Sequence, residues 1–379
     1  MSKYLKLFET TSQYNDYING SDVVLPNVSV AKDAPSTVYF NPLPPHDYSN
    51  DYLTFVALED GTFTFNMDQK LTTAAVPEMS YSTDNGKTWT TVQNIDNQIV
   101  TVRTPTITRG NKVLWKSNAV QYCINPDYPY PSTNIGQGSF SSTSTYNVEG
   151  NIMSLMYGDD FKEKTSFKTP ISSGPQVVGT FSNLFNTSRN IISVEHLVLP
   201  ATTLANNCYY SMFKDCTRLT TAPELPATTL ADSCYYSMFQ NCTSLTSAPE
   251  LPATTLQSSC YYYMFQNCAS LTTAPELPAT TLANSCYSYM FSGCTRLTTA
   301  PVLPATTLAN KCYHYMFKGC TKLNYIKAMF TTTPSTSYTS NWVNGVAATG
   351  TFVKNSAATW NVTGVNGIPS GWTITTASA

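Results

Sequence analysis

The cysteines show the most regular spacing among the residues whose types could do chemistry. Of the eleven cysteines in the 379-residue chain, ten recur in pairs eight residues apart, beginning with Cys208 and Cys216. On a helix this spacing separates the two Cα atoms by about 12 Å, too far for a disulfide. A single file of thiols also cannot surround a tetrahedral metal ion. We therefore expect buried, reduced thiols and no metal site, while Cys123 stands outside the pattern and is uninformative.

The other reactive residues do not form a catalytic set. Three histidines lie in a linker, a cap and a repeat: His46, His196 and His314. None has a nucleophile or carboxylate at catalytic spacing, and no phosphate loop or paired-cysteine motif is present. Residues 82–89 fit one Asp-box pattern, familiar from sialidase-like propellers, where several copies would be expected. We interpret Asp84 and Trp89 as turn and core residues, and we expect no enzyme activity and no cofactor.

Two rows of side chains are candidates for binding. The first is a row of aromatic rings, whose flat faces suit contacts with sugars or proteins. Its members are Tyr210, Tyr236, Tyr262, Tyr263, Tyr289, His314 and Tyr315. The second row is Glu224, Glu250 and Glu276, three like charges that repel unless they splay or find a partner. Tolerated exposure of tyrosine and hydration of the glutamates are the structural alternatives.

A repeated sequence motif sets the positions of both the aromatic row and the glutamate row. Leu-Pro-Ala-Thr-Thr-Leu begins at Leu199, Leu225, Leu251, Leu277 and Leu303, so the period is 26 residues without insertion. Fixed repeats of this length are typical of solenoids, in which each unit buries its apolar face against its neighbours. We expect the units to stack in register.

Within a unit, helical periodicity places the invariant apolar residues on one side. These positions predict a helix of about ten residues, followed by a short strand bounded by prolines. The predicted core set of the first unit is Leu204, Cys208, Met212, Phe213, Cys216 and Leu219. Because packed helices need more room than paired strands, stacking such units predicts a curved horseshoe with the strands inside.

The repeat resembles the bacterial surface-antigen (BspA-like) class of leucine-rich repeats. Cys-x-x-Leu, Leu-Pro and Met-Phe-x-x-Cys carry the resemblance over about 130 residues, with methionine where that class has alanine and with a longer unit. Such repeats occur in surface proteins of gut bacteria and in virion proteins of their phages. The resemblance implies adhesion or recognition rather than catalysis.

The whole chain is expected to be a multidomain α+β protein. We predict a small N-terminal attachment module over residues 1–45 and an all-β, sandwich-like domain over 46–166. A degenerate capping repeat follows over 167–198, then the leucine-rich-repeat solenoid over 199–330 and a β-like C-terminal cap over 331–379. Six short strands are expected in the all-β domain, at residues 53–58, 62–65, 79–81, 88–92, 99–102 and 113–115.

The amino-acid composition limits the classes of partner that the chain is expected to bind. Charged residues make up only 12% of the chain and the formal net charge is -2. A basic surface for nucleic acid or anionic lipid is therefore not expected, and no segment predicts membrane insertion. The opening residues lack the apolar run of an export signal. That favours synthesis and assembly in a host cytoplasm.

Two functions agree with these features. The first is a structural component of a phage virion, a tail or head fibre that contacts other virion proteins through residues 1–45 and displays the repeats towards a host glycan or protein. Fibres of this kind are usually homotrimers. The alternative is a bacterial cell-surface or secreted adhesin.

Overall fold

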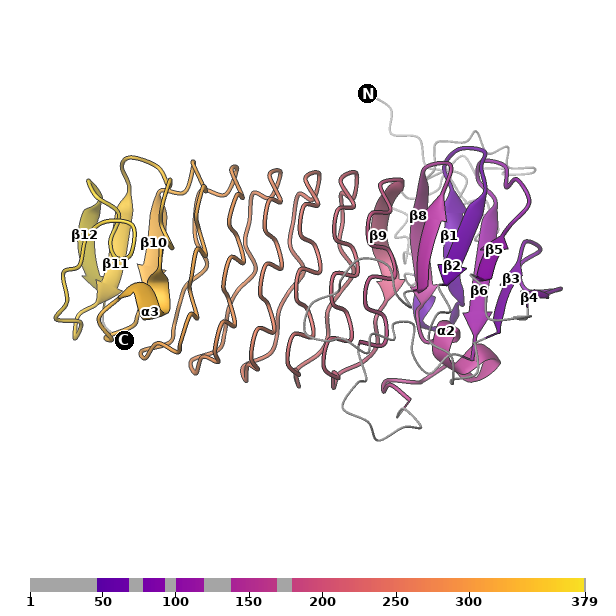
Figure 1. Cartoon of the computed structure of the whole chain (residues 1–379), viewed down its shortest axis with the longest axis horizontal. Helices are drawn as coiled ribbons and strands as arrows, with labels where there is room; N and C mark the ends of the chain where they lie inside the picture. Colours follow the sequence, from indigo (N-terminus) through magenta and orange to yellow (C-terminus); the bar gives the residue numbers. More distant parts are fainter. Residues whose placement is uncertain (1–45, 68–77, 93–99, 119–137, 169–178, 378–379) are drawn as a thin grey trace, which may run out of the picture. The chain divides into compact units, whose positions relative to one another are not determined.

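A computed structural model describes residues 46–67, 78–92, 100–118, 138–168 and 179–377. Apart from His46, these residues belong to one compact unit, Asp47–Ala379 (Figure 1). Their regular secondary structure is mainly strand, and the described helices have only three or four residues each. The helices are η1 (Tyr48–Asn50), α2 (Ser154–Tyr157), η2 (Gly158–Asp160) and α3 (Thr336–Thr339). The attachment module and Cys123 lie outside the described residues.

Two facing sheets form the first part of the unit. One has the strand order β4-β3-β6-β1-β8-β9 and the other β5-β2-β7. The bounds of the first are β4 (Thr90–Val92), β3 (Met79–Ser82), β6 (Lys112–Ser117), β1 (Leu53–Ala57), β8 (Tyr146–Asn151) and β9 (Ile191–Val198); those of the second are β5 (Val100–Arg103), β2 (Phe63–Met67) and β7 (Gly138–Ser142). Phe55 of β1 contacts Phe63 and Phe140 of the other sheet, with ring centroids 5.5 and 4.9 Å apart.

All six strands expected in this part are present, because alternating burial along each strand is visible as alternating residue type. β6 shows it plainly, with Val113 and Trp115 fully buried between more exposed neighbours. β7 and β8 are two further strands, and β8 pairs in parallel with β9. Since β9 also forms an isolated bridge from Ser193 to Thr221, the hydrogen bonding continues from the sheet into the repeats.

Successive 26-residue copies are hydrogen-bonded to one another. Bridges join equivalent threonines in a column, Thr203 to Thr229, Thr229 to Thr255 and Thr255 to Thr281. On the other side of the copy, Phe213 N donates to Met238 O at 2.9 Å. Figure 1 shows the copies as side-by-side chain segments between β9 and β10 (Tyr325–Ala328).

The predicted helix of each copy is wrong. Residues 205–216 instead form a run of consecutive four-residue turns, the turn run. Alternate N–H groups donate forward to the next copy, as Tyr209 N does to Cys234 O at 3.0 Å. The N–H groups between them donate back three residues, as Tyr210 N does to Asn207 O at 3.1 Å. A helix would satisfy all these groups internally, whereas here half of them bind the neighbouring copy.

Left-handed residues make the turn run possible. Asn207, Ser211 and Asp215 have φ values of 55°, 52° and 62°. Asparagine, aspartate and glycine adopt this conformation more readily than other residues. The third position is occupied in later copies by Asn241, Asn267, Gly293, Gly319 and Gly345. Asp215 and its equivalents are thus the last of three left-handed positions in each turn run.

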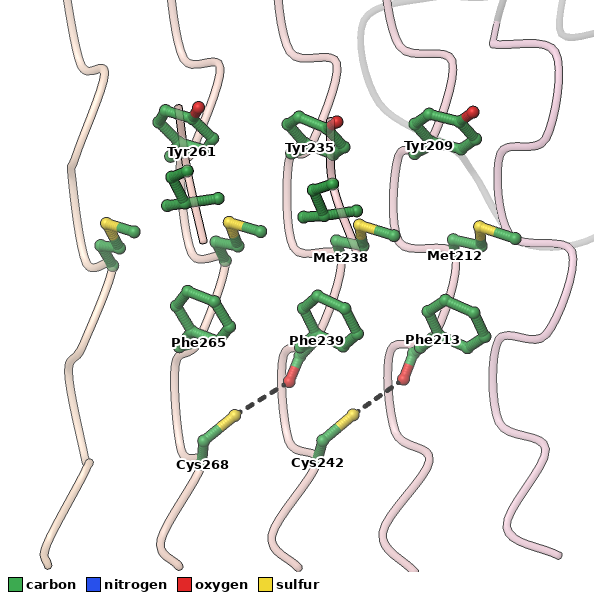
Figure 2. Packing of buried hydrophobic residues seen from close by; sticks show 14 of the residues in the cluster. Tyr209, Met212, Phe213, Tyr235, Met238, Phe239, Cys242, Tyr261, Phe265 and Cys268 are labelled. Carbon is green, nitrogen blue, oxygen red and sulfur yellow. Dashed lines mark hydrogen bonds between the residues drawn. The ribbon is translucent and has the colours of Figure 1, made fainter. Parts of the chain in front are cut away.

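The predicted core set is buried throughout. Tyrosines stack in one internal column, with Tyr209 and Tyr235 centroids 5.7 Å apart, and phenylalanines stack in another, with Phe213 and Phe239 5.6 Å apart (Figure 2). The chosen residues Leu204, Cys208, Met212, Phe213, Cys216 and Leu219 all lie among these columns. Turns of four residues repeat nearly as helical turns do, so the same side chains point inward.

The thiols of the repeat are free and buried, as expected. The helical spacing that led to this expectation does not exist, but the conclusion holds for a different reason. Cys242 Sγ donates to Phe213 O at 3.0 Å and Cys268 Sγ donates to Phe239 O at 3.1 Å (Figure 2). The second cysteine of each pair is therefore used as a hydrogen-bond donor to the preceding layer.

The physical reason for expecting a curved horseshoe does not apply to this structure. It rested on helices needing 8 to 10 Å between copies on one side, against about 4.8 Å for strands on the other. Backbone hydrogen bonding joins the copies both in the predicted strand segment, at the Ser247–Thr273 bridge, and in the predicted helix segment, at Phe213–Met238. Both sides therefore have the spacing of paired backbone.

The same stacking continues beyond the fifth copy. β10 pairs in parallel with β11 (Thr351–Asn355), which pairs in parallel with β12 (Thr373–Ala377). Another turn run precedes β11, since Tyr313 N donates to Tyr338 O at 3.0 Å and Phe317 N to Trp342 O at 2.8 Å. The β character expected for residues 331–379 is thus that of further layers on the stack.

Candidate functional site

The candidate tyrosines lie together on the outer surface of the turn runs. All are half-buried, and consecutive rings are in contact from one copy to the next. We call this set the tyrosine ridge: Tyr210, Tyr236, Tyr262, Tyr263, Tyr289 and Tyr315. The ring centroids along it are separated by 4.7, 4.9, 4.3, 4.6 and 4.5 Å in that order.

The ridge changes column at its middle. Its first three members occupy equivalent positions in successive copies, and its last three occupy the next position along the chain. Tyr262 and Tyr263 are sequence neighbours in the third copy and meet edge to face at 75°. This junction keeps the row of rings continuous where Ser288 replaces tyrosine in the first column.

Most ring faces in the ridge are covered by other rings. Tyr236 stacks on Tyr210 with an interplanar angle of 9° and on Tyr262 with 2°. Tyr289 and Tyr315 stack at 9°. A flat face open to a sugar was the basis of the sequence expectation, and for these rings the faces are used within the protein. The ring edges and phenol groups remain accessible to a ligand. Together they offer apolar and hydrogen-bonding surface, a combination that is common in protein interfaces.

Three members of the ridge have a strained backbone. Tyr263, Tyr289 and Tyr315 have φ values of 58°, 57° and 53°, at the position that Ser211 fills with 52° in the first copy. A left-handed backbone costs about 1–2 kcal/mol for a residue with a bulky Cβ substituent. Tyrosine in this conformation is unusual and often marks a functional position. The sequence alone did not reveal this feature, because it depends on recognising the four-residue turns.

Burial and neighbouring phenols raise the pKa values of two ridge tyrosines, Tyr262 and Tyr289. Burial is the main cause that raises the pKa of Tyr289 to about 12, with Tyr263 and Tyr315 adding to it. Burial also raises the pKa of Tyr262, and a hydrogen bond with Tyr263 contributes. Lys318 Nζ lies 5.2 Å from the Tyr315 ring centroid, where its charge favours the ring face.

His314 stands at the edge of the ridge and is held by the fold. Its Nε2 atom is 2.7 Å from Thr336 O, and its ring centroid is 6.2 Å from that of Tyr315. Burial lowers the pKa of His314 below that of an ordinary histidine. We assign this residue a role in fixing the last copies.

The other candidates serve the fold or are exposed to solvent. Asp84 Oδ1 accepts from Thr88 N at 2.9 Å and from Ser82 Oγ at 2.8 Å, and the bonds to Thr88 are the main cause that lowers the pKa of Asp84 to about 2. Trp89 is half-buried on the sheet surface beneath Lys116 Nζ, 4.2 Å from its ring, so it is not a core residue. Glu224, Glu250 and Glu276 are exposed.

Within the described ranges, no group of three or more histidine, cysteine, aspartate or glutamate side chains is arranged to hold a metal ion. The same ranges contain no helix with the length and apolar character needed to cross a membrane. No family model, curated protein or solved structure matches the chain.

Proposed function

We propose that the chain is a non-catalytic recognition protein, displayed on a phage virion as a tail or head fibre component. In this proposal the copies form a leucine-rich-repeat solenoid of the BspA-like type, and residues 1–45 attach the chain to other virion proteins. The tyrosine ridge is the binding surface for a host protein or glycan. The strained conformation of Tyr263, Tyr289 and Tyr315 is the observation that supports the ridge most directly.

Other residue types are found at the turn position that the three strained tyrosines occupy. Ser211, Ser237 and Asn341 occupy the same turn position in other copies, so smaller side chains are accommodated there. A left-handed backbone costs about 1–2 kcal/mol for a residue with a Cβ atom, less for asparagine, and the tyrosines recover about 0.5–1.5 kcal/mol from ring contacts. Stability therefore gives little reason for three successive tyrosines. A role in ligand binding explains why three successive copies have tyrosine at this position.

Replacement of the strained tyrosines separates binding from stability. We expect Tyr289→Asn to change the free energy of unfolding by less than about 1 kcal/mol, because relief of strain offsets the lost stacking. Adsorption of purified chain to host cells should fall in Tyr289→Asn and further in the triple variant at residues 263, 289 and 315. Thr254→Ala, an exposed change on the opposite side of the copy, is the control. Unchanged adsorption of the triple variant would move the binding site elsewhere.

Location of the chain tests the virion part of the proposal. Antibodies against the repeats should label intact particles by electron microscopy. Labelling of bacterial cell surfaces without phage, together with unlabelled particles, would instead support the adhesin alternative, which the resemblance to surface-antigen repeats also favours.

A further inference from the structure

The layer formed by β12 has an edge with which no described strand pairs. β12 is the final strand in the order β10-β11-β12, so only β11 pairs with it among the described strands. Thr373 N donates to Gly350 O at 2.8 Å, which directs the odd-numbered N–H groups of β12 towards β11. Because direction alternates along a strand, the N–H groups of Ile374 and Thr376 face the open edge.

A core column ends at this edge. Strand register places Ile326, Phe352 and Ile374 at equivalent positions in three successive layers. Ile326 and Phe352 are fully buried, whereas Ile374 is 42% exposed. Val365, in the same final segment, is 43% exposed. These are two of the three most exposed large apolar residues in the described part of the chain, and a terminal layer that meets only water normally has a polar outer face.

The final segment also lacks the usual protection of an exposed edge. Native edge strands are commonly protected by lysine, proline or inward charges. β12 contains none of these, and residues 355–379 contain no aspartate, glutamate, lysine, arginine or histidine. A surface of this kind can face an identical surface without like-charge repulsion.

We propose that two copies of this chain associate through their β12 strands, paired antiparallel about a two-fold axis at Thr375. Such pairing satisfies the outward N–H groups of Ile374 and Thr376 in both copies and places each Ile374 opposite a Thr376. It also covers the exposed Ile374 side chain of each copy. The opposite end of the stack is closed, since β9 pairs with β8, so this edge has no equivalent repeat end to join head to tail.

Mass measurements test the contact on the full chain. Analytical ultracentrifugation should give twice the 41.6 kDa mass of one chain at micromolar concentration. Ile374→Lys places a charge in the column, and Thr376→Pro removes an outward donor without breaking the bond to β11. Both variants should sediment as single chains with an unchanged melting temperature. Thr254→Lys adds the same charge at an exposed site far from β12 in sequence and should stay dimeric.

A cross-link tests the two-fold geometry. Opposed residues that do not exchange hydrogen bonds have Cα atoms about 4.5 Å apart, within disulfide range. Thr375→Cys should therefore form a covalent dimer under mild oxidation, whereas Thr363→Cys, an exposed position in the same segment, should not. A wild-type chain that remains single at every concentration, dimers that persist in both edge variants, or open-ended filaments would each overturn the proposal. None of these outcomes depends on the tyrosine ridge.

Discussion

The second cysteine of each pair acts as a hydrogen-bond donor that joins its copy to the previous layer. Phe213 O accepts from Cys216 N of its own copy at 3.2 Å and from Cys242 Sγ of the next copy at 3.0 Å. The carbonyl oxygen has two lone pairs, so both bonds are possible at once. A thiol is small and apolar enough for the core and still supplies this donor.

The repeat thiols should therefore not react with thiol reagents in the folded chain. Burial raises the pKa of Cys234 and Cys320 to about 12, and the thiolate is the reactive form. In a Cys123→Ser background, we expect the ten buried thiols to react with Ellman's reagent only after denaturation. Rapid labelling of most of them under native conditions, or fewer than ten thiols in denaturant without reductant, would contradict this prediction.

The tyrosines predict loss of stability at alkaline pH. An ordinary tyrosine has a pKa of 10.0, and that of Tyr289 is raised to about 12 by burial. Since the folded pKa lies above the unfolded one, the protonated form stabilises the fold fully below pH 10, and this contribution is lost as pH rises through 12. Buried Tyr235 and Tyr261, with pKa values raised well above 10.0, add to the effect. Phenolate absorbance and circular dichroism should change together above pH 10. Ionisation of most tyrosines at pH 10 in a folded chain would contradict it.

The turn run shows which features of a structural element could be predicted from the sequence and which could not. Leu204, Cys208 and Met212 are spaced by four residues, which is compatible with a helix and with four-residue turns over so short a stretch. The inward side was therefore predicted correctly and the backbone was not. Asn207, Ser211 and Asp215 carried the missing signal, because residues prone to left-handed backbone recur every fourth position.

Exposure of the ridge could be predicted, but its ring stacking could not. Tyr210 and its equivalents fell on the variable side of the pattern, which placed them at the surface. The contact between Tyr263 and Tyr289 depends on the distance between copies and on a left-handed backbone, and both are set by hydrogen bonds between residues far apart in the sequence. Three strands of the two sheets in the first part, β7, β8 and β9, were not among the six expected.

A glycine in the turn run tests the left-handed assignment. Gly319 has a φ of 75°, and a Cβ added there would meet nothing closer than 3.8 Å, so backbone strain alone should decide the effect. We expect Gly319→Ala to lower the free energy of unfolding by about 1 kcal/mol. Gly319→Asn should cost clearly less, because Asn241 and Asn267 occupy this position in other copies. Urea denaturation of the two variants is the comparison, and equal losses would contradict the assignment.

At the scale of the whole molecule, the C-terminal layers cover the end of the stack. Three tryptophan N–H groups donate to backbone carbonyls there: Trp342 to Gly367 at 2.8 Å, Trp360 to Phe330 at 3.2 Å and Trp372 to Ala347 at 2.7 Å. Trp342 is fully buried and its ring contacts Phe317 at 6.1 Å. The ring contact with Phe317 and the bond from Phe317 N to Trp342 O at 2.8 Å join these layers to the fifth copy.

Loss of this cover should destabilise every copy. We expect Trp342→Ala to lower the free energy of unfolding by about 3–5 kcal/mol, as for other large core truncations. Removal of residues 331–379 should lower solubility and melting temperature together, since it exposes the apolar side of the fifth copy. Differential scanning calorimetry and sedimentation of both variants provide the measurement. A truncated chain that melts unchanged would show that these layers are independent of the repeats.

The bonds between copies have a consequence for how such a gene can change. Every copy donates and accepts through the same backbone atoms, from Tyr209 to Cys234 as from Tyr235 to Cys260. In-frame recombination between neighbouring copies would therefore insert or delete a whole layer while leaving both ends of the stack intact. Natural variants that differ by entire repeats should fold, whereas those that differ by part of one should not.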